Sequence, residues 1–391
     1  MDIRAIVLIG GATGEGAARA ETISGIPLAD VDVLGIPVVE RVVQRLHRFG
    51  VSSISVIRDV PAERAGFAHH SVFARHVSHS QATGEQFWQA GENTFLKHAQ
   101  DGADLVVTQR IGPYVEVDYE ALVQHHLDHR CSVTMAVDGD DAGLDLCVLS
   151  ACARMDATAL FQGRLQRLRR ECASFRVAGY VNRLRNAADL RRLAVDGLLA
   201  RNGVRPEGVE RKPGVWVGAR ARIHRKARVI APAFIGARSK IRASALITRG
   251  SVLEHHAEVD CGTVVENCTL LPFTCVGAGL DVMHSIVGFR RLTNLARNTE
   301  VEIGDAKLIG MAPLSAISRL AGSTAAIFTF LPKQIYRGLL ATSHRQSAAD
   351  TSGFLEPPGA ALETSTLEAS ATGPENSEFP KLAVARRYGD Q

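Results

Sequence analysis

Branched aliphatic residues recur at every sixth position through one long stretch of the chain. They are Val217, Ile223, Val229, Ile235, Ile241, Ile247, Leu253, Val259, Val265 and Leu271. The residue two places before each of them is mostly small, as at Ala221, Ser239 and Thr263. A period of six fits neither the 3.6-residue period of a helix nor the two-residue alternation of an ordinary strand. A fixed period of this kind predicts a solenoid.

A parallel β-coil explains both positions of the repeat. Each hexad forms one short flat side, and three hexads close one triangular turn. The aliphatic residues then stack along the axis as a core, and the small residues fit the tight corners. The alternative, the edge of an ordinary β-sandwich, does not account for the period. The stretch resembles the hexapeptide-repeat left-handed β-helix, which commonly belongs to acyltransferases or forms the C-terminal part of enzymes that make nucleotide sugars.

A different pattern opens the chain. Residues 3–9 (IRAIVLI) form an almost wholly apolar run, which is typical of a central parallel strand covered on both faces. Residues 38–49 (VVERVVQRLHRF) carry apolar side chains at helical spacing, and Gly50 is placed to end that helix as a C-cap. Residues 51–58 (VSSISVIR) predict a second strand. The order strand, loop, helix, strand predicts an α/β sheet.

A glycine-rich turn follows the first predicted strand. Its residues are Gly10, Gly11, Ala12, Thr13 and Gly14. Because glycine has no Cβ atom, the backbone N–H groups of such a turn can approach phosphate oxygens closely. The turn matches neither the dinucleotide-binding motif GxGxxG nor a P-loop motif. We interpret these five residues as a nucleotide-binding loop, and the alternative is a tight strand-to-helix turn without a ligand.

The order of these segments resembles the sugar-1-phosphate nucleotidyltransferase family, whose members open with a strand, GGxGTRLxPLT and PKPLxPVxGKPxLEH. Residues 103–108 (ADLVVT) resemble the family's central strand, and residues 180–193 (YVNRLRNAADLRRL) resemble its W-x-D-I-G-T-P-x-D-Y segment. Residues 279–310 resemble the closing segment of chains similar to mannose-1-phosphate guanylyltransferase. The resemblance implies an α/β fold with a Rossmann-like nucleotidyltransferase domain followed by a left-handed parallel β-helix. It also implies synthesis of a nucleotide sugar, similar to GDP-mannose, for polysaccharide biosynthesis.

Four positions depart from the catalytic pattern of that family. The motif arginine is replaced by Glu15 or Gly16, and the motif lysine is replaced by Ile26. The aspartate that ends the central strand is replaced by Arg110, and the second metal-binding aspartate is replaced by Asn182. Mg²⁺ is bound mainly by carboxylate oxygens. The catalytic residues are therefore unknown, and the two metal-binding positions hold a cation and a neutral amide in place of carboxylates.

Two functions remain open from the sequence. If Glu116 and Asp118, just past the central strand, take over as metal ligands, the chain is an active transferase with Mg²⁺ as its cofactor. If they do not, no metal or other cofactor is expected, and the chain is a non-catalytic regulatory or scaffold subunit. In both cases the expected ligand is a nucleotide or a nucleotide sugar. The β-helix is expected to associate with further copies of the chain or with a partner subunit.

The chain is predicted to have four parts. Residues 1–205 form the nucleotidyltransferase-like α/β domain, and residues 213–310 form the left-handed β-helix. Residues 313–341 are apolar and either cap the end of the coil or lie on a membrane surface, because their longest uncharged run is too short to span a bilayer. Residues 343–391 are rich in Ser, Thr, Ala, Glu, Pro and Gly and are predicted to be a disordered tail.

The net charge and the cysteines limit which partners and which compartment the sequence predicts. The net charge of +4 is too small to predict a nucleic-acid partner. The cysteines show no CxxC spacing, and no secretory leader precedes them, so we expect reduced thiols in a cytoplasmic protein. The cysteines are Cys131, Cys147, Cys152, Cys172, Cys261, Cys268 and Cys275.

Three further groups of residues are candidates for a site. One is the histidine-rich stretch with His69, His70, His76 and His79, which lacks metal partners at fixed spacing and is better interpreted as a solvated insertion. The pair His255 and His256 lies inside the repeat, where a histidine is the general base of hexapeptide acyltransferases. The third is a basic helix face with Arg164, Arg167, Arg169 and Arg170, which we interpret as solvated.

Overall fold

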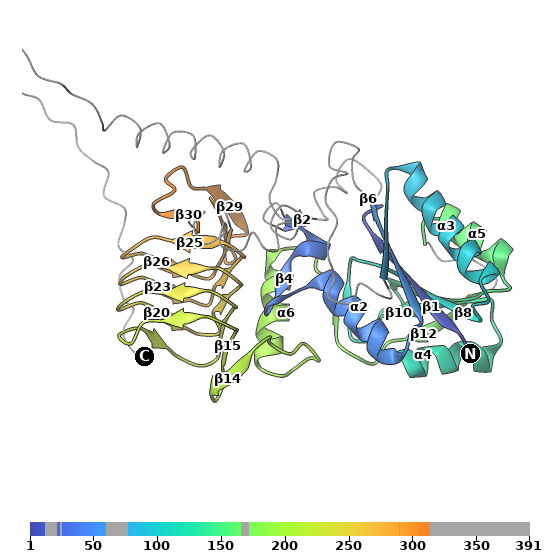
Figure 1. Cartoon of the computed structure of the whole chain (residues 1–391), viewed down its shortest axis with the longest axis horizontal. Helices are drawn as coiled ribbons and strands as arrows, with labels where there is room; N and C mark the ends of the chain where they lie inside the picture. The colour runs from blue at the N-terminus through green and yellow to red at the C-terminus, as the bar shows by residue number, and fades with distance from the viewer. Residues whose placement is uncertain (12–21, 24–25, 60–76, 166–171, 289, 313–391) are drawn as a thin grey trace, which may run out of the picture. The chain divides into compact units, whose positions relative to one another are not determined.

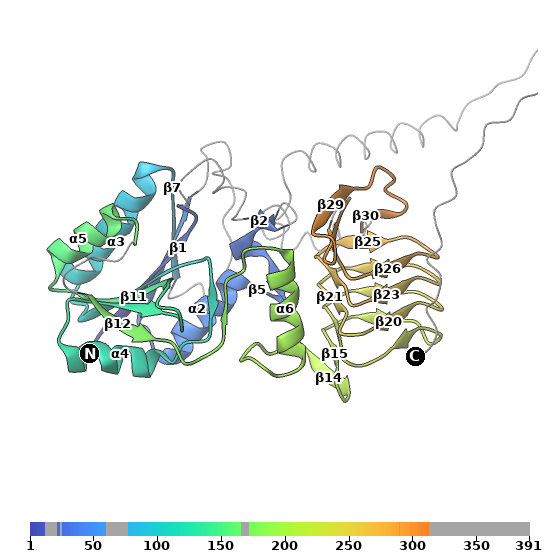
Figure 2. The same cartoon turned by 180° about the vertical axis from the view of Figure 1, so that it is seen from behind.

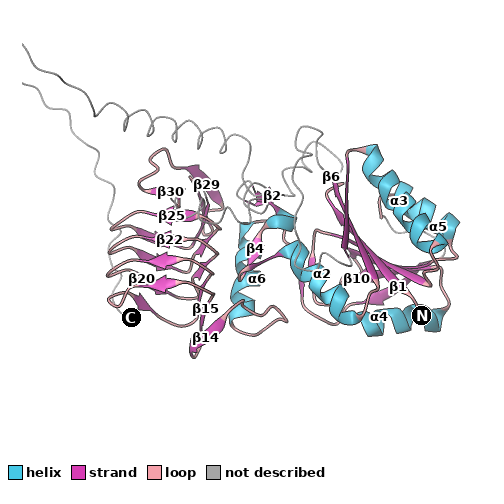
Figure 3. Ribbon diagram, viewed as in Figure 1, coloured by secondary structure: helices cyan, strands magenta, loops and turns pink. Residues whose placement is uncertain are grey.

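The computed structural model describes residues 1–11, 22–23, 26–59, 77–165, 172–288 and 290–312. These residues form a mixed α/β protein with many parallel strands (Figures 1 and 3), and this confirms the predicted α/β class. The predictions for residues 313–341 and 343–391 lie outside the described residues. None of the described helices is long and apolar enough to cross a membrane.

A seven-stranded sheet organises the N-terminal half, with the strand order β12-β10-β11-β8-β1-β6-β7. The strands are β1 (Ile3–Ile9), β6 (Ser53–Asp59), β7 (Val77–Ala82), β8 (Leu105–Arg110), β10 (Val133–Val137), β11 (Gly143–Ser150) and β12 (Cys172–Arg176). β11 runs antiparallel to its neighbours β8 and β10, while the other neighbouring pairs are parallel. The strands predicted before and after the first helix, at residues 3–9 and 51–58, are confirmed as β1 and β6.

Helices cover both faces of this sheet (Figures 1 and 2). The covering helices are α2 (Val38–Phe49), α3 (Glu85–Gln100), α4 (Tyr119–His129) and α5 (Arg154–Gln162), whereas α6 (Ala187–Leu198) lies apart from this sheet. In β1, Ile6 and Leu8 pack with α3 and α5, whereas Ala5 and Val7 pack with α2 and α4. Burial on both faces explains why this strand is a continuous apolar run. Gly50 ends α2 in the left-handed conformation with φ of 97°, as predicted.

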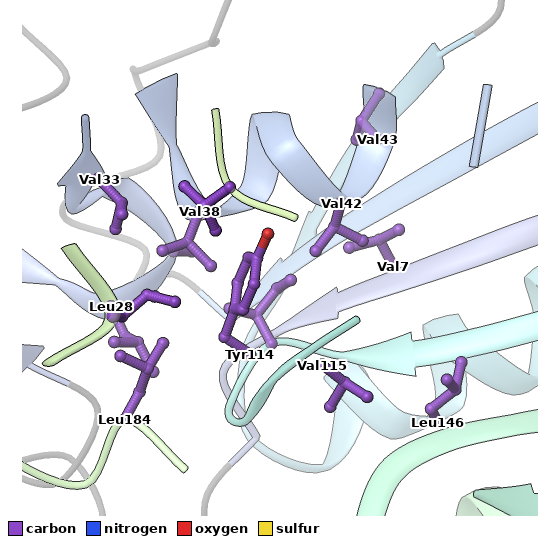
Figure 4. Close-up of a cluster of buried hydrophobic side chains, with 14 of the residues drawn as sticks. Val7, Leu28, Val33, Val38, Val42, Val43, Tyr114, Val115, Leu146 and Leu184 are labelled. Carbon is purple, nitrogen blue, oxygen red and sulfur yellow. The ribbon is translucent and has the colours of Figure 1, made fainter. Parts of the chain in front are cut away.

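Short elements connect the sheet to the rest of the chain. They are β2 (Thr22–Ile23), β3 (Ile26–Pro27), the 3₁₀-helix η1 (Leu28–Asp30), β4 (Asp32–Val33), β5 (Ile36–Pro37), β9 (Tyr114–Val115) and β13 (Val181–Asn182). β4 pairs with β5, and β9 pairs with β13, both antiparallel. Figure 4 shows how Leu28, Val33 and Tyr114 from these elements pack with Val38 and Val42 of α2. The connecting elements therefore belong to the core of the sheet.

Residues 215–288, here called the ladder region, form three stacks of short parallel strands. The first stack holds β15 (Val215–Val217), β18 (Ala233–Ile235), β21 (Val252–Leu253), β24 (Thr269–Leu270) and β27 (Ser285–Gly288). The second holds β16 (Arg222–Ile223), β19 (Lys240–Ile241), β22 (Glu258–Val259) and β25 (Thr274–Val276). The third holds β17 (Arg228–Val229), β20 (Leu246–Thr248), β23 (Val264–Glu266) and β26 (Asp281–Met283), some of which Figure 2 shows one above another.

Antiparallel strands flank two of these stacks. β14 (Val209–Lys212) precedes β15 in the first stack, and β28 (Arg291–Asn294) and β29 (Thr299–Glu302) follow β27. β30 (Ile309–Met311) pairs with β25 at the end of the second stack. In the described part of the chain, β16 and β17 have no strand before them, so each is the edge of its stack.

The pairing register changes once along the ladder region. Ile235 pairs with Leu253, one turn of three hexads further along the chain. Leu253, however, pairs with Leu270 rather than Leu271, because the corner around Asn267 is one residue shorter. Leu270 consequently lines the inner core, whereas Leu271 packs in the core of the α/β half. The predicted inward position of Leu271 is therefore wrong.

One hydrophobic cluster spans the α/β half and the ladder region. Phe234, Val252 and Ile286 of the first stack share it with Leu190 and Leu193 of α6. Hydrogen bonds reinforce this contact, since Arg191 of α6 donates to the carbonyl oxygen of Gly250 (2.6 Å), to Asn267 Oδ1 (2.9 Å) and to Thr269 Oγ1 (3.2 Å). The first stack is thus buried against the rest of the protein rather than exposed to solvent.

Candidate functional site

The carboxyl ends of β1, β6 and β8 meet at one edge of the sheet. The chain leaves β1 toward β6 on one side and returns to β8 on the other side, so the strand order reverses beside β1. In open α/β sheets, ligands bind outside the carboxyl ends of the strands at such a reversal. Gly10 and Gly11 lie at this edge, directly after β1. The other predicted loop residues, Ala12, Thr13 and Gly14, lie outside the described residues.

Both described glycines adopt conformations that favour glycine. Gly10 has φ of 106° and Gly11 has φ of 76°. A Cβ atom at Gly10 would lie 2.6 Å from Cβ of Asp59, and one at Gly11 would lie 2.4 Å from the ring of Phe87. The Gly11 N–H donates to Asp59 Oδ2 at 3.2 Å. Close packing therefore requires these glycines, while the Gly11 amide faces a negatively charged oxygen.

Arg110 ends β8, at the position where the resemblance implies a metal-binding aspartate. Its guanidinium donates to Asp145 Oδ2 at 2.8 Å. About a quarter of each side chain is exposed, 23% for Arg110 and 25% for Asp145. Asp145 lies on β11, the antiparallel strand next to β8. The edge of the sheet therefore carries a partly exposed cation whose orientation is fixed by a carboxylate.

Asn182, at the position where the resemblance implies a second metal-binding aspartate, has a structural role. Its side chain is buried, and its Nδ2 donates to the carbonyl oxygen of Asp189 at 2.9 Å. Its Oδ1 accepts the N–H of Leu184 at 3.0 Å. These bonds hold β13 against α6. The amide is therefore committed to the protein backbone.

Glu116 and Asp118 are also engaged by the protein. The hydroxyl of Tyr114 donates to Glu116 Oε1 at 2.6 Å, and Arg45 lies 3.6 Å from the same oxygen. Asp118 is the N-cap of α4, where its Oδ1 accepts the N–H of Glu120 at 3.0 Å and the N–H of Ala121 at 3.1 Å. Both carboxylates are held by these partners, so they do not converge on a common cation.

Two further carboxylates near this edge are paired with arginines. Asp30 forms two hydrogen bonds with Arg58, at 2.9 and 3.1 Å. Asp138, which follows β10, forms an ion pair with Arg183. Within the described ranges, no group of three His, Cys, Asp or Glu side chains is placed to hold a metal ion. The described residues therefore do not fit the Mg²⁺ ion that the resemblance implies.

A buried polar cluster that sequence reasoning missed joins residues 32–35 to the ladder region. Glu254 is fully buried and accepts the N–H groups of Leu34 (2.8 Å) and Gly35 (2.7 Å). His255 Nδ1 lies 2.5 Å from Oδ2 of Asp32, whose side chain is fully buried. Burial and the charge of Asp32 raise the pKa of Glu254 to about 8. No sequence signal links these residues, because more than 200 positions separate them.

The two histidines of the repeat have opposite environments. Burial lowers the pKa of His255, but the carboxylates of Asp32, Glu254 and Glu207 raise it by more, so its net pKa is raised. His256 stacks on Phe273, with ring centroids 4.7 Å apart, and burial lowers its pKa to about 3. A general base must be unprotonated to accept a proton, and the raised pKa of His255 favours its protonated form. This shift does not favour acyl transfer at the pair.

The other candidate groups are only partly described. His69, His70 and His76 lie outside the described residues, and His79 lies on β7. Arg164 forms an ion pair with Glu85 at 2.7 Å, whereas Arg167, Arg169 and Arg170 are not described. The described cysteines other than Cys172 are free thiols. No protein-family model matches the chain, and the search of curated proteins found no significant match.

Proposed function

We propose that the chain is a nucleotide-sugar-binding, non-catalytic subunit of the sugar-1-phosphate nucleotidyltransferase type, with a regulatory or scaffold role in polysaccharide biosynthesis. The proposal includes a Rossmann-like nucleotidyltransferase domain and a left-handed parallel β-helix in the ladder region. The parallel sheet with one antiparallel strand and the regular steps between paired strands support this assignment. A cytoplasmic location and association through the β-helix belong to the same proposal.

The observation that carries the proposal is the cation at the end of β8. Nucleotidyl transfer needs positive charge on the phosphates, which this family supplies through Mg²⁺ bound to carboxylates. Here Arg110 stands in place of one carboxylate, and the carboxylate of Asp145 orients it. A guanidinium binds phosphate oxygens in a bidentate manner and keeps its charge at every physiological pH. Arg110 can therefore contact phosphate oxygens of a diphosphate directly, without a metal.

Metal independence gives a sharp test. We expect saturable binding of a nucleotide sugar, with GDP-mannose as the first probe, and the same Kd in Mg²⁺ and in EDTA. Arg110→Ala should weaken binding at least about tenfold, which corresponds to about 1.4 kcal/mol. The measurement is isothermal titration calorimetry of the full chain against a panel of nucleotide sugars.

Arg176→Ala is the matched control for this substitution. Arg176 ends β12 at the same edge of the sheet and is paired with Asp141, but both side chains are more than half exposed, 62% and 61%. Its loss should leave the Kd unchanged. Pyrophosphate release from an NTP and a sugar 1-phosphate should stay at background. Turnover that requires Mg²⁺ would overturn the non-catalytic assignment, and binding that disappears in EDTA would overturn the metal-independent role of Arg110.

A further inference from the structure

The first turn of the ladder region carries a strong excess of positive charge. We call residues 209–231 the opening turn. Its only carboxylate is Glu210, and all of its cationic side chains are exposed. They are Arg211, Lys212, Arg220, Arg222, Arg225, Lys226 and Arg228. In the described part of the chain, none of these cations forms an ion pair, which distinguishes them from most of the cations elsewhere in the ladder region.

In the next turn of the ladder region, cations are paired with carboxylates. Lys240 pairs with Glu258 of the following turn, and Arg249 lies 2.9 Å from Glu266. Each of these cations has a carboxylate on a neighbouring strand. Arg222, by contrast, lies in register with Lys240, so its neighbour in the stack carries the same charge. The positive charge of the opening turn is therefore not compensated within the stacks.

Exposed apolar side chains lie among these cations. Ile223 is 39% exposed, Ile230 is 42% exposed and Val209 is 64% exposed. Ile223 belongs to β16, which is an edge strand of its stack. Ile241 and Val259, which follow Ile223 along the same stack, are buried. The opening turn is thus the place where the inner core of the ladder region reaches the solvent, surrounded by arginine and lysine.

From this combination we propose that the opening turn docks onto a membrane surface that contains anionic lipids. A layer of anionic headgroups complements the cations, and the region just beneath it accepts isolated aliphatic side chains. Nucleic acid fits less well, since the turn's one aromatic residue, Trp216, packs in the core shared with the α/β half. A second copy would present the same positive charge if it met this surface face to face. The inference does not rest on the proposed nucleotide-sugar binding.

Cosedimentation of the full chain with vesicles tests the surface. The wild-type chain should bind vesicles of phosphatidylcholine and phosphatidylserine, and it should not bind phosphatidylcholine alone. The variant with Arg222→Gln, Arg225→Gln, Lys226→Gln and Arg228→Gln should bind about a hundredfold or more weakly, because each cation near an anionic surface contributes roughly a fivefold gain. Its thermal unfolding should match the wild type, since these side chains are exposed.

A charge-matched variant controls for net charge. Arg48→Gln, Lys97→Gln, Arg154→Gln and Arg192→Gln remove four exposed cations from α2, α3, α5 and α6. This variant should bind vesicles within about threefold of the wild type, as expected for cations remote from the surface. Equal losses in the two variants, or equal binding by the opening-turn variant and the wild type, would overturn the proposal.

Three further measurements distinguish a lipid surface from nucleic acid and from a role of the cations in preventing self-association. Ile223→Ser should weaken vesicle binding several-fold without a change in charge. A single-stranded oligonucleotide bound more tightly than the vesicles would overturn the choice of a lipid partner. Cations on edge strands also prevent end-to-end association of sheets. If the opening-turn variant only self-associates, in sedimentation velocity, and keeps its vesicle affinity, the cations serve that purpose and the proposal is wrong.

Discussion

Glu254 fixes the conformation of a loop that is distant in sequence. Its two oxygens accept the N–H groups of Leu34 and Gly35. Both residues have positive φ, 54° for Leu34 and 93° for Gly35, so the loop is held in a conformation that leucine rarely adopts. The buried carboxyl group of Glu254 between two amides compensates for this backbone geometry. The side chain therefore acts as a link between the ladder region and the segment that follows β3.

Loss of this carboxylate should be costly. Glu254→Ala leaves two amide donors without acceptors and opens a small cavity, so we expect the free energy of unfolding to fall by about 2–5 kcal/mol. Glu300→Ala is the control, because Glu300 pairs with Arg291 on the surface, and we expect it to cost at most about 1 kcal/mol. Urea denaturation followed by circular dichroism measures both. Similar costs in the two variants would show that the link carries no stability.

The sequence predicted some features of single residues and missed others. The departures at Arg110 and Asn182 rest on the resemblance, Arg110 through its place after residues 103–108 and Asn182 through its place in residues 180–193. The sequence could not show that Gly11 lies against Phe87, or that Asp32 meets His255, because these contacts depend on how distant segments pack. A glycine required by packing and a glycine required by a phosphate look the same in a sequence.

At the scale of elements, the period of six predicted the inner core of the ladder region as far as Val265. Every inward aliphatic residue from Ile235 to Val265 packs in one cluster. The prediction failed at Leu271, since one corner is shortened by a residue and the chain offers aliphatic residues at both 270 and 271. A repeat pattern thus predicts the side that faces inward but not the length of each corner.

Shortening an aliphatic side chain of the ladder region should cost more stability where the side chain is buried than where it is exposed. Ile247 is fully buried in β20, and Ile247→Ala should lower the free energy of unfolding by about 2–5 kcal/mol through lost burial and the cavity left behind. Ile230, 42% exposed, provides the same chemical change at the surface of the same region, and Ile230→Ala should cost about 0.5 kcal/mol or less. Chemical denaturation at neutral pH compares them. A small effect at Ile247 would contradict the inward register of β20.

At the scale of the whole molecule, the cluster of Asp32, Glu254 and His255 couples stability to pH. The raised pKa values of Glu254 and His255 mean that the folded state binds protons that the unfolded state releases. Their contribution is present at low pH and is lost as the pH rises toward and past 8. His256 works in the opposite direction, because its pKa is lowered to about 3 and its contribution is lost as the pH falls below 6.5.

We therefore expect stability to fall between about pH 6.5 and about pH 8. The loss should amount to about 2 kcal/mol, an order of magnitude set by one proton over about 1.5 pH units. The free energy of unfolding, measured by urea denaturation at several pH values, tests this. Glu254→Ala should flatten the slope over the same range. A wild-type stability that rises with pH here would show that Glu254 is ionised at neutral pH.

The hydrophobic cluster shared by α6 and the first stack also constrains the order of events during synthesis. Leu190 and Leu193 leave the ribosome well before Phe234, Val252 and Ile286, which cover them in the folded protein. At typical elongation rates this delay lasts on the order of ten seconds. During that time the nascent α/β half exposes an apolar face that its own residues do not cover. Burial of this face is completed only when the ladder strands arrive.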